Sequence, residues 1–223
     1  MLREAASDLY YHSLRLVAGN LLWGVVLLAS LWFGMVAPPL VLLGGVALVP
    51  ISIGLMRMVT SVVREGHTVM SDFGAAFRPR AWRHVALGFG QLMLLLVAAG
   101  DLLIGVQLGG MLGTFLAVSA IYMLFAVWVL GLTCWPVLLD PLRSDEPISH
   151  NLRLGVALAL ARSGRLSGLA LLLGAVLAGS TVLAALLLTV AVAFAFLVAA
   201  RYVLPAADRL EGRETVETDH DDR

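Results

Sequence analysis

Long apolar runs, separated by short polar segments, dominate the hydropathy pattern of this chain. Four of the runs cover residues 16–36, 40–63, 85–106 and 108–139. A helix needs about 20 mostly apolar residues to cross the hydrocarbon core of a bilayer, and each run is at least that long. The pattern therefore predicts four transmembrane helices within this part of the chain.

The fifth apolar run, residues 166–204, is too long for one ordinary span. As a single helix it would measure about 58 Å at 1.5 Å per residue, against a hydrocarbon core of about 30 Å. A break around Gly179, Ser180 and Thr181 would divide the run into two short spans. We therefore predict an all-α, polytopic helical bundle of six transmembrane helices in three hairpins, with five helices as the alternative.

A short polar or amphipathic segment precedes each predicted hairpin. The three segments begin at Ser7-Asp8, Ser71-Asp72 and Ser149. Ser and Asp are preferred at helix N-termini, so we expect short interfacial helices on the cytoplasmic side. Their recurrence indicates either three repeated units of surface helix and hairpin or ordinary capping that recurs by chance.

The overall composition supports the membrane class. Hydrophobic residues make up 60% of the chain, charged residues 13%, and the mean hydropathy is +0.93, whereas a soluble domain is about 45–50% apolar and about 25% charged. A nucleic-acid binder with a broad basic face is excluded, and the single cysteine, Cys134, excludes a disulfide scaffold. The bilayer is the expected partner.

Arginine placement predicts the orientation. Arginines flank the connections between spans two and three and between spans four and five, and the other two connections carry no charge. Since basic loops stay in the cytoplasm, the N-terminus is predicted to be cytoplasmic. Residues 1–204 form the predicted transmembrane domain. Residues 205–223 are rich in acids and are predicted to be a disordered cytoplasmic tail.

Polar side chains within the predicted spans are candidates for an intramembrane site. Asp101 is the sharpest, because acids within membrane helices usually face a bundle interior or a water-filled cavity. Its position near the outer end of span three allows a second interpretation, in which it reaches headgroup water. Asn20 and Gln91 are better explained as hydrogen-bond donors between helices than as a substrate site.

The segment before span three is a candidate for cytoplasmic docking or anchoring. Phe73 and Phe77 have helical spacing that predicts an apolar stripe in the membrane interface, and Trp82 suits the interfacial aromatic belt. The basic residues of this segment that complete the candidate set are Arg78, Arg80 and Arg83. Anchoring alone or docking of a cytoplasmic partner would explain them.

The sequence gives little support to catalysis. Its five histidines show no metal-ligand spacing, and it has neither lysine nor a phosphate-binding loop. We therefore expect no enzymatic activity, no cofactor and no metal site.

Several short motifs resemble the YesL-like family of bacterial membrane proteins. They are Asn20-Leu21-Leu22-Trp23, Pro50 with Gly54 and Arg57, Ser71-Asp72-Phe73 with Phe77, Asp101, and Trp135-Pro136. The resemblance implies a multi-pass protein of the bacterial cytoplasmic membrane, accessory to carbohydrate uptake, with a sugar-transporter permease or ATPase subunit as partner. The alternative is a small transporter or channel with Asp101 in the pathway. The sequence leaves the sugar and the oligomeric state open.

Overall fold

The computed structural model describes residues 2–37, 40–74, 82–182 and 190–213, and in this part of the chain every regular element is helical. The all-α prediction is therefore confirmed. The elements, in chain order, are α1 (Leu2–Tyr11), α2 (Ser13–Val36), α3 (Leu40–Glu65), α4 (Met70–Gly74), α5 (Trp82–Leu108), α6 (Gly110–Leu138), the 3-10 turn η3 (Pro141–Arg143), α7 (Ile148–Ala161), α8 (Ser163–Val182) and α10 (Val192–Glu211).

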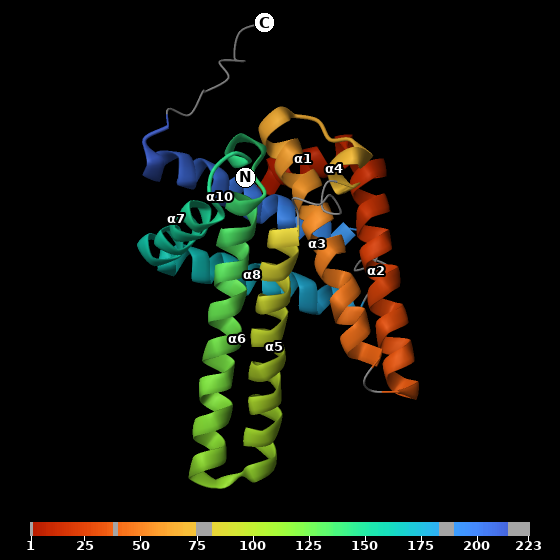
Figure 1. Ribbon diagram of the computed structural model, residues 1–223, viewed down its shortest axis with the longest axis vertical. Coiled ribbons are helices and arrows are strands. Elements are labelled where there is room, and N and C mark those ends of the chain that lie inside the picture. The colour runs from red at the N-terminus through yellow and green to blue at the C-terminus, as the bar shows by residue number, and fades with distance from the viewer. Residues whose placement is uncertain (1, 38–39, 75–81, 183–189, 214–223) are drawn as a thin grey trace, which may run out of the picture.

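Two long antiparallel hairpins, α2 with α3 and α5 with α6, correspond to the first four predicted spans (Figure 1). Gly109 and Gly110 turn the second hairpin with φ angles of 62° and 61°, which glycine adopts at no steric cost. The helices meet closely beside this turn, since a Cβ on Gly105 would lie 2.7 Å from the backbone nitrogen of Ala117. The C-terminus of α2 and the N-terminus of α3 point toward the same end of the molecule as the turn between α5 and α6 (Figure 1), and we call this the turn end. We call the opposite end the charged end; α3 ends there at Glu65 and α5 begins there at Trp82.

The third pair, α8 and α10, differs from the other two. Figure 1 shows both helices running across the long hairpins instead of alongside them. Five helices of the described chain are long and apolar enough to cross a membrane, namely α2, α3, α5, α6 and α8. The fifth apolar run is divided between α8 and α10, so it is not the single long helix of the five-helix alternative. The sixth predicted span would include residues 183–189, which lie outside the described residues. α8 ends at Val182, next to the predicted break.

A short helix precedes each pair of long helices. α1 comes before α2 and α3, α4 before α5 and α6, and α7 before α8 and α10. Each short helix includes one of the Ser-bearing segments that predicted it. The order of elements therefore repeats three times, although the third pair is placed differently in space.

α10 corrects the predicted domain boundary. The helix continues through Pro205 to Glu211, and Ala206, Ala207 and Asp208 are buried. The prediction that a disordered tail begins at residue 205 is therefore wrong for residues 205–211, because the two alanines of this segment pack against other helices and its acids, Asp208 and Glu211, pair with arginines. Residues 214–223 of the predicted tail lie outside the described residues.

Candidate functional site

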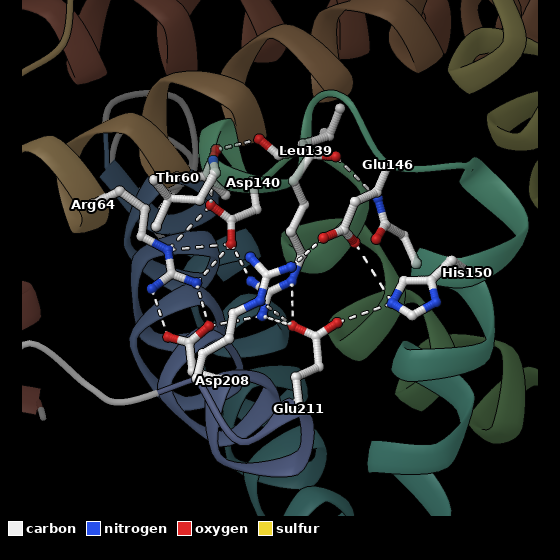
Figure 2. Close-up of polar contacts among 12 residues, drawn as sticks. Thr60, Arg64, Leu139, Asp140, Glu146, His150, Asp208 and Glu211 are labelled. Atoms are coloured by element: carbon white, nitrogen blue, oxygen red, sulfur yellow. Dashed lines mark hydrogen bonds and ion pairs between the residues drawn. The ribbon is translucent and has the colours of Figure 1, made fainter.

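The charged end contains a buried network of ion pairs that joins three parts of the chain (Figure 2). Arg64, near the end of α3, contacts Asp140 at 2.6 Å and Asp208 at 2.7 Å. Asp140 follows α6 directly, and Asp208 lies in the last turns of α10. Arg64 therefore links α3, α6 and α10 through a single guanidinium group.

Arg143 in η3 provides the second cation of the network and is only 1% exposed. It pairs with Asp140, with Asp208 at 2.7 Å and with Glu211 at 2.7 Å. The Asp140 side chain also accepts a hydrogen bond from the backbone nitrogen of Leu142 at 3.1 Å, which caps η3. Since buried charges are costly unless they are paired and hydrogen-bonded, this arrangement satisfies each member from several directions.

The network lowers the pKa values of its acids on α10. Burial alone would raise the pKa of Asp208, but hydrogen bonds from Arg64 and Arg143 outweigh it and hold the pKa below its usual value. Burial likewise opposes ionisation of Glu211, and contacts with Arg143 and His150 bring its pKa down. Burial disfavours the cation of Arg143, yet its acidic partners raise the pKa of that guanidinium. These groups therefore remain ionised at neutral pH.

Three side chains at the rim of the network could offer ligand atoms to a metal ion. Glu146, His150 and Glu211 each place one such atom within 4.8 Å of the others, and His150 Nε2 lies 3.0 Å from Glu211 Oε1. Both carboxylates already have cationic partners, however, because Arg213 pairs with Glu211 and with one oxygen of Glu146, and Arg143 also pairs with Glu211. The cluster is accordingly explained as the outer part of the ion-pair network.

The same end carries further cross-links to α3 and α10. Arg57 and Thr60 both donate to the carbonyl of Leu139, at 3.1 and 2.8 Å, and so satisfy a carbonyl at the C-terminus of α6. Arg201 of α10 pairs with Asp8 of α1 at 2.6 Å. The polar groups at this end thus hold the helices together.

The candidate intramembrane residues are not brought together. Asn20 is fully buried, and its side-chain oxygen accepts a hydrogen bond from the backbone nitrogen of Ala193 at 2.8 Å, so it satisfies a backbone donor in the first turn of α10. Gln91 accepts a hydrogen bond from the indole of Trp135 on α6. Both residues therefore join helices to one another.

Asp101 stands apart from these contacts. It is half-buried on α5, between the middle of the helix and the turn end. Among the described residues, no hydrogen bond or ion pair reaches its side chain.

The candidate docking residues also separate. Phe73 is buried between α2 and α3, where a Cβ on Gly54 would lie 2.9 Å from its ring. Phe73 is therefore packed against other helices, and it does not lie in the apolar stripe of the membrane interface that its spacing predicts. Trp82 and Arg83 are exposed at the start of α5. Phe77, Arg78 and Arg80 lie outside the described residues.

A cavity of about 560 Å³ lies between the two long hairpins and is also lined by α8 and α10. Its walls include the indoles of Trp23, Trp128 and Trp135. Each ring nitrogen donates to another helix: Trp23 to Ser52 at 2.9 Å, Trp128 to the carbonyl of Ala170 at 3.1 Å, and Trp135 to Gln91. None of the described side chains that line the cavity is titratable. We call this the central cavity.

Sequence reasoning missed both the network and the central cavity. In the sequence, Arg64 and Arg143 indicate only the orientation of the chain, and Asp208 and Glu211 fall in the predicted tail. The sequence shows that Arg64 lies at the end of a predicted span. It does not show that Arg64 pairs with Asp208, which lies 144 positions further along the chain. Comparison with known proteins gives no match to this chain among family models, curated proteins or solved structures.

Proposed function

We propose that this multi-pass membrane protein is a non-enzymatic accessory component of carbohydrate uptake in the bacterial cytoplasmic membrane. The observation that carries the non-enzymatic part is the separation of ionisable groups from the central cavity. The buried charges are paired at the charged end, and the described cavity lining contains none. General acid–base or nucleophilic catalysis needs such groups within reach of a bound substrate.

The chemistry of the cavity also favours an accessory role over transport of the sugar itself. A carbohydrate presents many hydroxyl groups, and each one that is buried without a hydrogen bond costs free energy. The cavity walls are mostly Leu, Val, Ile and Trp side chains, and their indole nitrogens are already paired. Another protein would therefore carry the sugar, and the motifs that resemble the YesL-like family support a permease or ATPase subunit in that role.

The charged end is the side on which we place such a partner. Arginines lie in its connections, and the positive-inside rule assigns it to the cytoplasm. Trp82 is 64% exposed there, next to exposed Arg83, and exposed aromatic and arginine side chains are enriched among the residues that dominate protein interfaces. This pair is the proposed contact.

A small transporter or channel is the second candidate, and one observation favours it. Asp101 is a half-buried carboxylate within a candidate span, and it lacks a hydrogen-bonding or ionic partner among the described residues. Acids within membrane spans commonly mark ion and proton pathways. Its position outside the lining of the central cavity argues against the two forming one pathway.

Two measurements test the proposal together. The purified protein in liposomes should show no uptake of a labelled oligosaccharide, and a tagged copy in bacterial membranes should recover a sugar-transporter permease or ATPase. Replacing Trp82 with Ala and Arg83 with Glu should reduce this recovery. Trp32→Ala is the control, because Trp32 is 65% exposed on α2 toward the turn end. Uptake by the protein alone would support the second candidate, and unchanged recovery by the double variant would overturn the proposed contact.

A further inference from the structure

The central cavity lies at membrane depth. Met56, among its lining residues on α3, is nine residues before the end of that helix at Glu65, which corresponds to about 14 Å along the axis. Other lining residues, including Gly45 on α3 and Leu95 on α5, lie further toward the turn end. The cavity therefore begins well below the ion-pair network and extends into the apolar part of the bundle.

The walls of the cavity are held open. Trp23 is tied to α3, Trp128 to α8 and Trp135 to α5 through their indole nitrogens. An indole whose nitrogen is bonded to a neighbouring helix cannot rotate into the space without breaking that hydrogen bond, and an unmade hydrogen bond is costly in an apolar environment. The volume is also within the range of about 300–1,000 Å³ that small-molecule sites occupy.

Water and polar solutes suit this space poorly. A buried water molecule needs two to four polar partners, and the polar side chains that the lining offers, Ser52 and Gln91, are already engaged by tryptophans. An empty space of this size would deprive its walls of dispersion contacts. An apolar chain would restore those contacts without needing a hydrogen bond.

We propose that the central cavity binds the acyl chain of a membrane lipid. Three observations favour an acyl chain as the ligand: the lining is apolar, the indole nitrogens are already hydrogen-bonded, and the cavity lies within the candidate spans. Lining residues such as Leu27, Leu48 and Leu95 are only partly buried by protein, so an acyl chain can contact their side chains. This inference goes beyond the accessory role and does not depend on the identity of any protein partner.

Tryptophan fluorescence offers a direct test, because three of the five tryptophans line the cavity. The other two, Trp32 and Trp82, are exposed and are replaced with Phe. The variant that carries both replacements is reconstituted in phospholipid vesicles, with or without bromine on the acyl chains. Bromine quenches the fluorescence of an indole only on close approach. We expect strong quenching of the three cavity indoles. Absence of quenching would overturn the proposal.

Filling the cavity distinguishes a bound chain from lipid around the outside of the bundle. In the same background, Leu48→Phe and Leu95→Phe add bulk to the lining and should remove most of the quenching. The matched controls are Val46→Phe and Leu96→Phe, whose side chains are 43% and 36% exposed and do not line the cavity; they should leave the quenching unchanged. Equal quenching in filled and control variants would overturn the proposal.

A second measurement uses the unaltered protein and does not depend on the folding of any variant. A phospholipid with a photoactivatable group on its acyl chain is incorporated into the vesicles and crosslinked. Labelling of Leu48, Leu95 or Phe196 is expected, with labelling of exposed Val97 and Leu103 as the reference for surface lipid. Crosslinks confined to the reference positions would overturn the proposal.

Discussion

Helices α3 and α5 are both long and apolar, yet their surroundings differ sharply. In the most apolar stretch of α3, 56% of the residues are buried within the protein, against 11% in α5. The buried face of α3 carries Thr60 and Ser61, and its Arg57 and Arg64 are bonded to other elements. α5 carries Asp101, which has no such bond within the described chain. Apolarity therefore predicts that a helix enters a membrane, and its polar and small residues indicate which face meets other helices, because lipid is as apolar as leucine.

The largest expected effect comes from removing the charge that α3 contributes to the network. Arg64→Met leaves Asp140 and Asp208 with Arg143 as their remaining cation, and breaking a buried ion pair from one side costs about 3–5 kcal/mol. Unfolding in detergent should show this loss. Arg83→Met on α5 is the control, and its exposed position predicts a change within about 0.5 kcal/mol. Equal stability of both variants would mean that the network contributes little.

Removing the acids of α10 tests the same network from its other side. A chain that ends at Ala207 lacks Asp208 and Glu211, so Arg143 is left buried with only Asp140. We expect a loss near the lower end of the same range, about 3 kcal/mol. A chain that ends at Arg213 keeps both acids and should have the same melting temperature as the full-length protein. Identical melting of the two truncated chains would contradict the structural role given to α10.

One glycine on α3 and one on α5 provide a matched test of how tightly the two helices are packed. A Cβ on Gly54 of α3 would lie 2.9 Å from both the ring and the backbone oxygen of Phe73, whereas a Cβ on Gly90 of α5 would meet nothing within 4 Å. Overpacking of a tight contact costs about 1–3 kcal/mol, so Gly54→Ala should destabilise the protein by that amount. Gly90→Ala should be neutral or slightly stabilising, since alanine favours the helix. Thermal melts of the two variants would refute this difference if they coincide.

Acid should weaken the charged end by a smaller amount, because protonation removes charge and leaves the side chains in place. The pKa values of Asp208 and Glu211 are lowered in the folded protein. Their stabilisation is therefore fully present above their unfolded pKa values of about 3.9 and 4.3, and it is lost as the pH falls through the lower folded values. The double variant Asp208→Asn/Glu211→Gln should show a shallower fall in melting temperature below about pH 4 than the original protein. Parallel curves would contradict this assignment.

Much of the fold could be predicted from the sequence, since membrane helices have a strong and local signal. The ends of α2, α3, α5 and α6 lie within a few residues of the predicted spans. The placement of α8 and α10 could not be predicted, because hydropathy gives length but not direction. Phe73 shows the same limit: its helical spacing indicated an apolar face, while its partner face, formed around Gly54, is distant in sequence.

The candidate site was less predictable for a related reason. Asn20 and Gln91 both join helices, as expected of an amide in an apolar run, but the side-chain oxygen of each accepts a hydrogen bond, a role that the sequence does not predict. The identity of each hydrogen-bonding partner, such as the Ala193 backbone for Asn20, depends on tertiary contacts. The same holds for Arg143, whose burial follows from acids on α10 that resembled a solvated tail in the sequence.

Asp101→Asn should have the smallest effect on stability and is the most informative about α5. Asp101 lies seven residues before the end of α5 at Leu108, or about 10 Å along the axis. A helix of 27 residues is about 40 Å long and exceeds the hydrocarbon core of about 30 Å, so this position is close to the headgroups. Removing a carboxylate that has no ionic partner should then change the free energy of unfolding by less than about 0.5 kcal/mol.

The control for that variant is Asp140→Asn, which removes a fully buried acid paired with Arg64 and Arg143 and should be clearly destabilising. Unfolding in detergent and oligosaccharide uptake in liposomes are measured for both proteins. A large loss of stability in Asp101→Asn would reveal a structural contact beyond the described residues. Uptake by the original protein that disappears in Asp101→Asn, with the fold intact, would place this carboxylate in a transport pathway, because only a functional charge loses flux without losing structure.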